Sequence, residues 1–179
     1  MVRFIMTLAL VVSLKTGYSQ PLVPINKESR VTFRIKNAGI AVTGSFKGLE
    51  GKIDFDPGNS SPGTIDVSID ANTIDTDNET RDAHLRKERY FDVKNYPRIH
   101  FVSTRIIRGT KAGEFILSGK LTIKNVTKNL NFPFTIKPVS DGYLFTGDFR
   151  INRRDFGVGR SSTISKKLNV YLEVVARKL

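Results

Sequence analysis

Apolar and polar residues alternate along most of this chain, and this alternation constrains the fold more than any other feature. Val31, Phe33 and Ile35, for example, are separated by single polar residues. Successive side chains of a β-strand point to opposite faces, so each such run predicts a strand with one buried and one solvated face. The same period recurs at residues 40–46, 49–55, 65–69, 99–101, 115–123, 130–136, 143–151 and 168–174.

Turn-forming residues separate these runs and leave mostly short connections. They lie at Gly48 and at residues 56–59, 109–113, 141–142 and 157–159. Eight or nine strands without a second domain predict an all-β fold, either an antiparallel β-barrel of about eight strands or a β-sandwich. Glycines on the apolar faces favour the barrel, because barrel corners and ligand cavities need bends or close approach there. These glycines are Gly44, Gly51, Gly119 and Gly147.

One segment lacks this period and has the features of a helix. Thr76 and Glu79 have the spacing of a capping box, a pair that begins many helices. The sequence therefore predicts one short polar helix near residues 77–89, ending before Tyr90. Because this helix is too short and too polar to build a core, we expect it to lie across one end of the barrel.

The first residues have the order of a secretory signal peptide. Arg3 provides a positive start, an apolar run follows at 4–14, and Gly17 and Ser19 are small residues at cleavage-like spacing. The apolar run is too short to span a bilayer, which takes about 20 residues. We therefore expect a signal peptide at 1–19, a single β-barrel domain at 20–179, and a periplasmic or secreted location.

The chain is strongly basic. Its formal net charge is +12, and it falls to +10 without Arg3 and Lys15 of the expected signal peptide. Such a charge invites a nucleic-acid partner. However, the cations are spread along the chain, alternate with apolar residues and form no basic helix, so we expect no nucleic-acid partner. Solvated strand faces account for most of them, and transient contact with an anionic membrane surface fits the same charge.

The sequence contains no recognised motif of a catalytic or metal site. The absence of cysteine removes a thiol nucleophile, a lipid-modified cysteine and a zinc–thiolate site. The two histidines, His84 and His100, have no third ligand at a recognised spacing. No G-x-S-x-G elbow is present, and the glycines at 157–159 open no helix. We therefore expect no enzyme activity, no cofactor and no metal.

A few cations are candidates for binding a polar headgroup. Arg81 and His84 lie three positions apart and share one face of the expected helix. At the mouth of a barrel they would face a polar or phosphorylated headgroup, together with Arg154. In the alternative interpretation these residues are structural: Arg81 and Asp82 would fix the helix to the barrel by hydrogen bonds, and Arg154 would pair locally with Asp155.

From Ser29 to Lys178 the sequence resembles the polyisoprenoid-binding, YceI-like lipid-binding family. Six stretches carry the resemblance, and their order and spacing make it specific. They are V-T-F-R-I-K-N-A-G at 31–39, G-S-F-K-G-L-E-G-K-I-D-F-D-P at 44–57, I-D-T-D-N-E-T-R-D-A-H-L at 74–85, Y-F-D-V-K-N-Y-P-R-I-H-F-V-S-T at 90–104, G-K-L-T-I-K-N-V-T-K at 119–128 and I-N-R-R-D-F-G-V-G at 151–159. This chain has Lys124-Asn125 where many relatives carry His-Gly.

The resemblance implies an extended, lipocalin-like antiparallel β-barrel. It further implies an exported carrier or storage protein that binds an isoprenoid or similar apolar lipid, such as an isoprenoid quinone or a prenyl diphosphate, as its ligand. The alternative is a solid-cored module that binds envelope polymers or anionic membranes through its basic face. We expect the apolar tail to lie against Phe33, Phe46, Ile53, Phe55, Val67, Phe101, Phe115, Leu117, Phe132, Phe134, Phe145 and Phe149.

Overall fold

The computed structural model describes residues 21–58 and 63–178. The expected signal peptide at 1–19 lies outside the described residues. Strands dominate the described residues, which also contain one α-helix, α1 (Glu79–Leu85), and two 3-10 helices, η1 (Asn26–Glu28) and η2 (Arg153–Phe156). The strands are β1 (Leu22–Pro24), β2 (Arg30–Asn37), β3 (Ile40–Asp54), β4 (Thr64–Asp75), β5 (Arg98–Arg108), β6 (Glu114–Ile123), β7 (Val126–Val139), β8 (Gly142–Asn152) and β9 (Lys167–Lys178).

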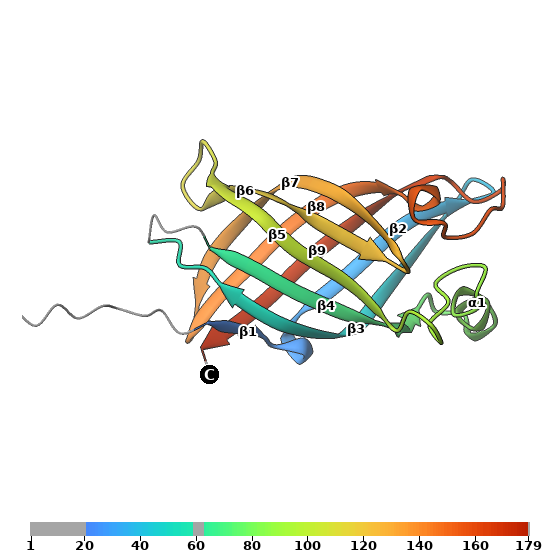
Figure 1. Cartoon of the computed structure of the whole chain (residues 1–179), viewed down its shortest axis with the longest axis horizontal. Coiled ribbons are helices and arrows are strands. Elements are labelled where there is room, and N and C mark those ends of the chain that lie inside the picture. The colour runs from blue at the N-terminus through green and yellow to red at the C-terminus, as the bar shows by residue number, and fades with distance from the viewer. Residues whose placement is uncertain (1–20, 59–62, 179) are drawn as a thin grey trace, which may run out of the picture.

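Eight of these strands form a closed antiparallel barrel (Figure 1). The order is β3-β2-β9-β8-β7-β6-β5-β4, and β4 pairs back to β3. The short strand β1 lies between the ends of β3 and β9, where Leu22 pairs with both Ile53 and Lys178. The sequence-based expectation of a barrel of about eight strands is confirmed, and the sandwich is wrong.

Strand β3 differs from its prediction. The apolar runs at 40–46 and 49–55 were expected to be two strands separated by a turn at Gly48, whereas the structure has one strand from Ile40 to Asp54. The inward face changes from even to odd positions at a β-bulge, where the register against β4 shifts between Lys47 and Glu50. Gly48 has a φ of +70°, in the left-handed region that glycine adopts without steric cost.

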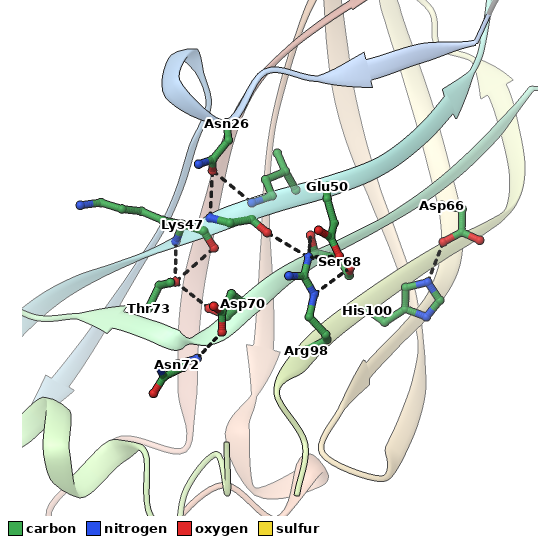
Figure 2. A network of polar contacts seen from close by, with 12 residues as sticks. Asn26, Lys47, Glu50, Asp66, Ser68, Asp70, Asn72, Thr73, Arg98 and His100 are labelled. Atoms are coloured by element: carbon green, nitrogen blue, oxygen red, sulfur yellow. Dashed lines mark hydrogen bonds and ion pairs between the residues drawn. The ribbon is translucent and has the colours of Figure 1, made fainter. Parts of the chain in front are cut away.

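Polar side chains satisfy the backbone at this bulge (Figure 2). The amide of Gly48 donates to Asn26 Oδ1 at 2.9 Å, and its carbonyl accepts from Arg98 Nη2 at 2.9 Å. The amide of Lys47 donates to Thr73 Oγ1 at 2.8 Å. A bulge interrupts the hydrogen-bond ladder and leaves backbone groups without partners on the neighbouring strand. The side chains of Asn26, Arg98 and Thr73 provide the missing hydrogen bonds.

The end of the barrel that holds β1 is filled by side chains. Phe55 and Phe115 are both buried and meet edge to face, with ring centroids 5.1 Å apart. Leu22 and Ala176 close the same cluster from β1 and β9. Aromatic and aliphatic residues from most strands therefore seal this end.

Helix α1 lies at the opposite end of the barrel, as expected (Figure 1). It is shorter than the expected range of 77–89, and its N-cap is Asn78, which accepts from the amide of Arg81, not Thr76. Thr76 is buried, and its hydroxyl donates to Asp82 at 2.5 Å. The capping-box assignment of Thr76 was therefore wrong. Within residues 21–58 and 63–178, no helix is long and apolar enough to cross a bilayer.

Candidate ligand-binding cavity

A cavity of about 260 Å³ occupies the barrel from its middle to the end beside α1. All eight barrel strands and α1 contribute to its wall. On β9, for example, Leu168, Val170, Leu172 and Val174 all line it, because alternate residues of a strand face the same side. This part of the interior is open space, not a solid core.

The wall is almost entirely apolar. Aromatic rings cover much of it: Phe132 and Phe149 lie with their centroids 4.7 Å apart, and Phe101 lies 6.3 Å from Phe132. No carboxylate of the described residues lines the cavity. The two arginines that do, Arg81 and Arg153, belong to α1 and η2. The site therefore combines a long apolar surface with positive charge.

Ten of the twelve residues expected to contact an apolar tail line the cavity. Phe55 and Phe115 do not, and their rings pack against each other at the end that holds β1. Alternation predicts which face of a strand is buried, but not how far along the barrel a residue lies. The ten are Phe33, Phe46, Ile53, Val67, Phe101, Leu117, Phe132, Phe134, Phe145 and Phe149.

Glycines in the strands make room for two of these rings. A Cβ atom at Gly44 would collide with the ring of Phe33, and one at Gly119 with the ring of Phe101. The rings lie over strand positions that have no side chain of their own. A larger residue at either position would displace an aromatic ring of the cavity wall.

Arg81 is the charged residue of α1 that lines the cavity. Its Nε donates to Thr76 Oγ1 at 2.7 Å, and its Nη2 donates to the Thr76 carbonyl. Thr76 in turn is held by the buried carboxylate of Asp82. The structural and functional interpretations of Arg81 are therefore compatible: hydrogen bonds fix the side chain to the barrel, and the same side chain lines the cavity.

Arg153 is a cavity residue that the sequence analysis missed, having named Arg154 instead. Arg154 is exposed and does not line the cavity, whereas Arg153 is only 5% exposed and does. The strand parity points to Arg153, since Phe149 and Ile151 face inward at the same spacing. The expected pairing of Arg154 with Asp155 is wrong as well: Asp155 accepts from Asn152 Nδ2 at 2.7 Å.

The Arg153 guanidinium is surrounded by backbone carbonyls. Its five N–H groups each find an acceptor, at distances of 2.7–2.9 Å. Burial, followed by the nearby charge of Arg154, lowers the pKa of Arg153 from its ordinary value. The side chain ties the loop after η2 to the barrel and brings a cation to the cavity. The five acceptors are the carbonyls of Val158, Gly159, Ser161, Ile164 and Ser165.

The histidines do not come together. His84 is exposed on α1 and does not line the cavity, so it does not join Arg81 there. His100 lies on β5, with its Nε2 2.6 Å from Asp66 Oδ1 (Figure 2). In the part of the chain that the structure describes, no group of three or more histidine, aspartate or glutamate side chains is placed to hold a metal ion.

Solved structures of several bacterial proteins share this fold. Burkholderia cenocepacia BcnA superposes with a TM-score of 0.78 at 25% identity, covering 85% of this chain and 98% of BcnA. The YceI protein of Campylobacter jejuni gives 0.68 at 30% identity, covering 76% and 84%. A polyisoprenoid-binding domain from Saccharophagus degradans, implicated in plant cell wall breakdown, gives 0.72 at 14% identity, covering 90% and 100%. This last likeness concerns the fold alone.

Sequence comparison gives the family. Protein YceI of Salmonella arizonae is 35% identical over 108 residues, as is that of Salmonella paratyphi B. The match spans 58% of this chain and only 56% of these relatives' length. The family model described as the YceI-like domain matches residues 24–176, which is nearly the whole described barrel. The chain therefore belongs to the YceI-like domain family.

Proposed function

We propose that this protein is an exported carrier or storage protein that binds an isoprenoid chain in the barrel, with the polar head of the lipid at the end beside α1. One observation carries the proposal: the cavity wall is almost entirely apolar, and it includes the arginines Arg81 and Arg153 but no carboxylate of the described residues. A lipid with an anionic or electron-rich head, such as a prenyl diphosphate or an isoprenoid quinone, matches that arrangement. The polyisoprenoid-binding domain of Saccharophagus degradans, with the same fold, supports the choice.

Burial of the tail supplies a large favourable contribution to binding. Each five-carbon isoprene unit transferred from water contributes about 3–4 kcal/mol, at ~0.8 kcal/mol per buried carbon. Three units thus give about 10 kcal/mol before the costs of association are subtracted. Burial of the tail therefore offsets most or all of the cost of association, and contacts with the head add to it.

The length of the cavity indicates how much tail it holds. From Leu168 to Val174 the wall of β9 extends about 20 Å along the strand. Strands in such barrels tilt by roughly 40° from the barrel axis, which leaves about 15 Å along the axis. An extended carbon chain advances about 1.2 Å per bond, as the peptide backbone does, so a straight tail of about three isoprene units fits. Longer tails must fold back inside the cavity or extend out of the barrel at the end beside α1.

The two arginines differ in what they offer a headgroup. Within the described residues Nη1 of Arg81 makes no hydrogen bond, while its other two nitrogens are held by Thr76. Arg153 has donated all five of its N–H groups to carbonyls and contributes charge only. Arg81 therefore supplies a direct contact to a phosphate or carbonyl oxygen, and Arg153 a favourable potential.

The proposal includes export and excludes catalysis. Export rests on the signal-peptide pattern of residues 1–19. No group that could act as an activated nucleophile or general base is required, because retention of the lipid depends on burial and on charge at one end. The protein would carry its ligand unchanged.

Native mass spectrometry of the full chain, purified without detergent and followed by solvent extraction, tests the proposal. We expect one extractable isoprenoid lipid per protein molecule, and its mass would identify the tail and the head together. A protein that stays ligand-free after incubation with isoprenoid quinones and prenyl diphosphates would overturn it. The same measurement on protein with Leu172→Trp provides a control, because an indole in the cavity should exclude the tail.

A further inference from the structure

The hairpin turn between β2 and β3 is apolar and exposed. The turn consists of Ala38 and Gly39, strand β3 begins with Ile40 and Ala41, and all four residues are exposed. Ile40 is 72% exposed, the highest value among the large apolar side chains of the described residues. The turn lies at the end of the barrel where Asn37 and Ile164 line the cavity. An apolar tip therefore lies beside the α1 end of the cavity, which we call the cavity mouth.

The backbone of this turn makes its apolar composition unusual. Ala38 has a φ of +47° and Gly39 one of +85°, the left-handed pair that hairpins normally build from Asn-Gly or Asp-Gly. Elsewhere in the barrel, hairpin turns hold polar residues in this conformation: Lys124 at 56° and Asp141 at 59°. Alanine is sterically disfavoured there and offers no hydrogen bond in return. The turn keeps an apolar surface at a position that suits asparagine better.

The surroundings of the turn are positively charged. Neither residues 30–49 nor residues 156–172 contain an aspartate or glutamate. The two segments are joined: Ala38 N donates to the Thr163 carbonyl, and Ser165 N to the Lys36 carbonyl, both at 2.8 Å. Together residues 36–41 and 160–167 form one surface, the docking tip. Its exposed cations are Lys36, Arg160, Lys166 and Lys167.

We propose that the docking tip places the cavity mouth on an anionic lipid bilayer, with Ile40 inserted among the lipids and the four cations on phosphate headgroups. The inference rests on the proposed function, because a lipid carrier must load or unload at a membrane. Positive charge beside an exposed apolar side chain matches the interface of an anionic bilayer, where headgroup charge and hydrocarbon lie next to each other. Direct transfer through the mouth keeps the tail out of water.

Vesicle flotation with the full chain tests the docking tip. The vesicles are phosphatidylcholine containing 30% phosphatidylglycerol, compared with pure phosphatidylcholine. Wild-type protein should float only with the anionic vesicles, and Ile40→Asp should lower the bound fraction at least tenfold. Ile107→Asp is the matched control, since Ile107 is 39% exposed near the packed end of β5 and should bind as wild type does. Equal behaviour of the two variants would overturn the inference.

Charge reversal separates the docking tip from general attraction of a basic protein. Lys166→Glu and Lys120→Glu change the net charge equally, but Lys120 is exposed on β6, outside the docking tip. Lys166→Glu should weaken binding to anionic vesicles at least fivefold more than Lys120→Glu, because loss of one cation at such a surface alone costs about fivefold. Equal losses would show non-specific attraction and contradict a defined tip.

The proposed function and the docking tip can fail separately. Native mass spectrometry with lipid supplied in detergent micelles reports cavity binding without a bilayer, and Ile40→Asp should bind there as wild type does. Lipid binding without vesicle binding would refute the docking tip alone. Vesicle binding that depends on Ile40, in a protein that never binds an isoprenoid, would refute the proposed cargo alone.

Discussion

Replacing Arg153 by methionine should strongly destabilise the barrel at its α1 end. The substitution removes five hydrogen bonds from a charged donor and leaves five carbonyls of the loop after η2 without that partner. The loop connects η2 to β9, so its loss of order would reach the cavity wall at Ile164 and Leu168. The effect should therefore appear in stability and in ligand retention together.

The magnitude follows from two opposing contributions. Hydrogen bonds from a charged group contribute about 1.5–3 kcal/mol each, or roughly 7–15 kcal/mol for five. Against them stands the cost of burying a cation without a carboxylate partner, several kcal/mol. That cost is visible in the pKa of Arg153, which burial lowers. A net loss of about 3–5 kcal/mol is expected for Arg153→Met, comparable to breaking a buried pair.

Urea denaturation followed by circular dichroism measures this loss, and thermal unfolding should show a lower Tm by roughly 6–20 °C. Arg153→Lys keeps the charge but has three donors, so it should fall between the wild type and Arg153→Met. Arg154→Met is the matched control: its exposed side chain makes two long bonds to carbonyls, and we expect a loss of about 0.5 kcal/mol or less. If Arg153→Met lowered the free energy of unfolding no more than Arg154→Met does, the five hydrogen bonds from Arg153 to backbone carbonyls would contribute nothing to stability, and the reasoning would be refuted.

Three further predictions concern the cavity and the packed end. Arg81→Met should weaken binding of a prenyl diphosphate at least tenfold while His84→Ala leaves it unchanged, as measured by fluorescent-lipid displacement; equal effects would contradict the placement of the headgroup. Val170→Trp should reduce binding of tails with three or more isoprene units more than of one-unit tails, in the same assay, because the indole would fill part of the cavity. Phe115→Ala should cost about 3–5 kcal/mol in urea denaturation and leave tail affinity within about threefold of wild type, since Phe115 belongs to the packed end; a large loss of affinity in a folded variant would place it in the site after all.

Strand parity accounts for most of what could be predicted from the sequence. It identifies the inward face of nearly every strand, because period two is a local property of the backbone. Extended two positions beyond Ile151, past the end of β8, the same period would also have identified Arg153. It does not give depth along the barrel, so Phe55 and Phe115 were assigned to the same cavity as Phe149.

The bulge in β3 shows the other limit of local patterns. The sequence there contains a change of parity around Gly48, and either a turn or a bulge produces that change. The choice depends on Asn26 and Arg98, which come from distant parts of the sequence and satisfy the backbone of a continuous strand. Local alternation contains no information about such partners. The wrong assignment of Thr76 as the N-cap of α1 has a similar cause. The hydroxyl of Thr76 is already engaged with the side chains of Asp82 and Arg81, and the local spacing of Thr76 and Glu79 does not reveal these contacts.

The position of β9 has a consequence for how the chain folds. β9 pairs with β1, β2 and β8, so the strands on its two sides cannot be joined until it is in place. During synthesis, every earlier hairpin can form while the wall still has an open gap and no enclosed interior. Contacts between β2 and β9 span most of the sequence, and such distant pairings form slowly. The barrel therefore closes only when β9, the last strand of the described residues, pairs with both of its neighbours.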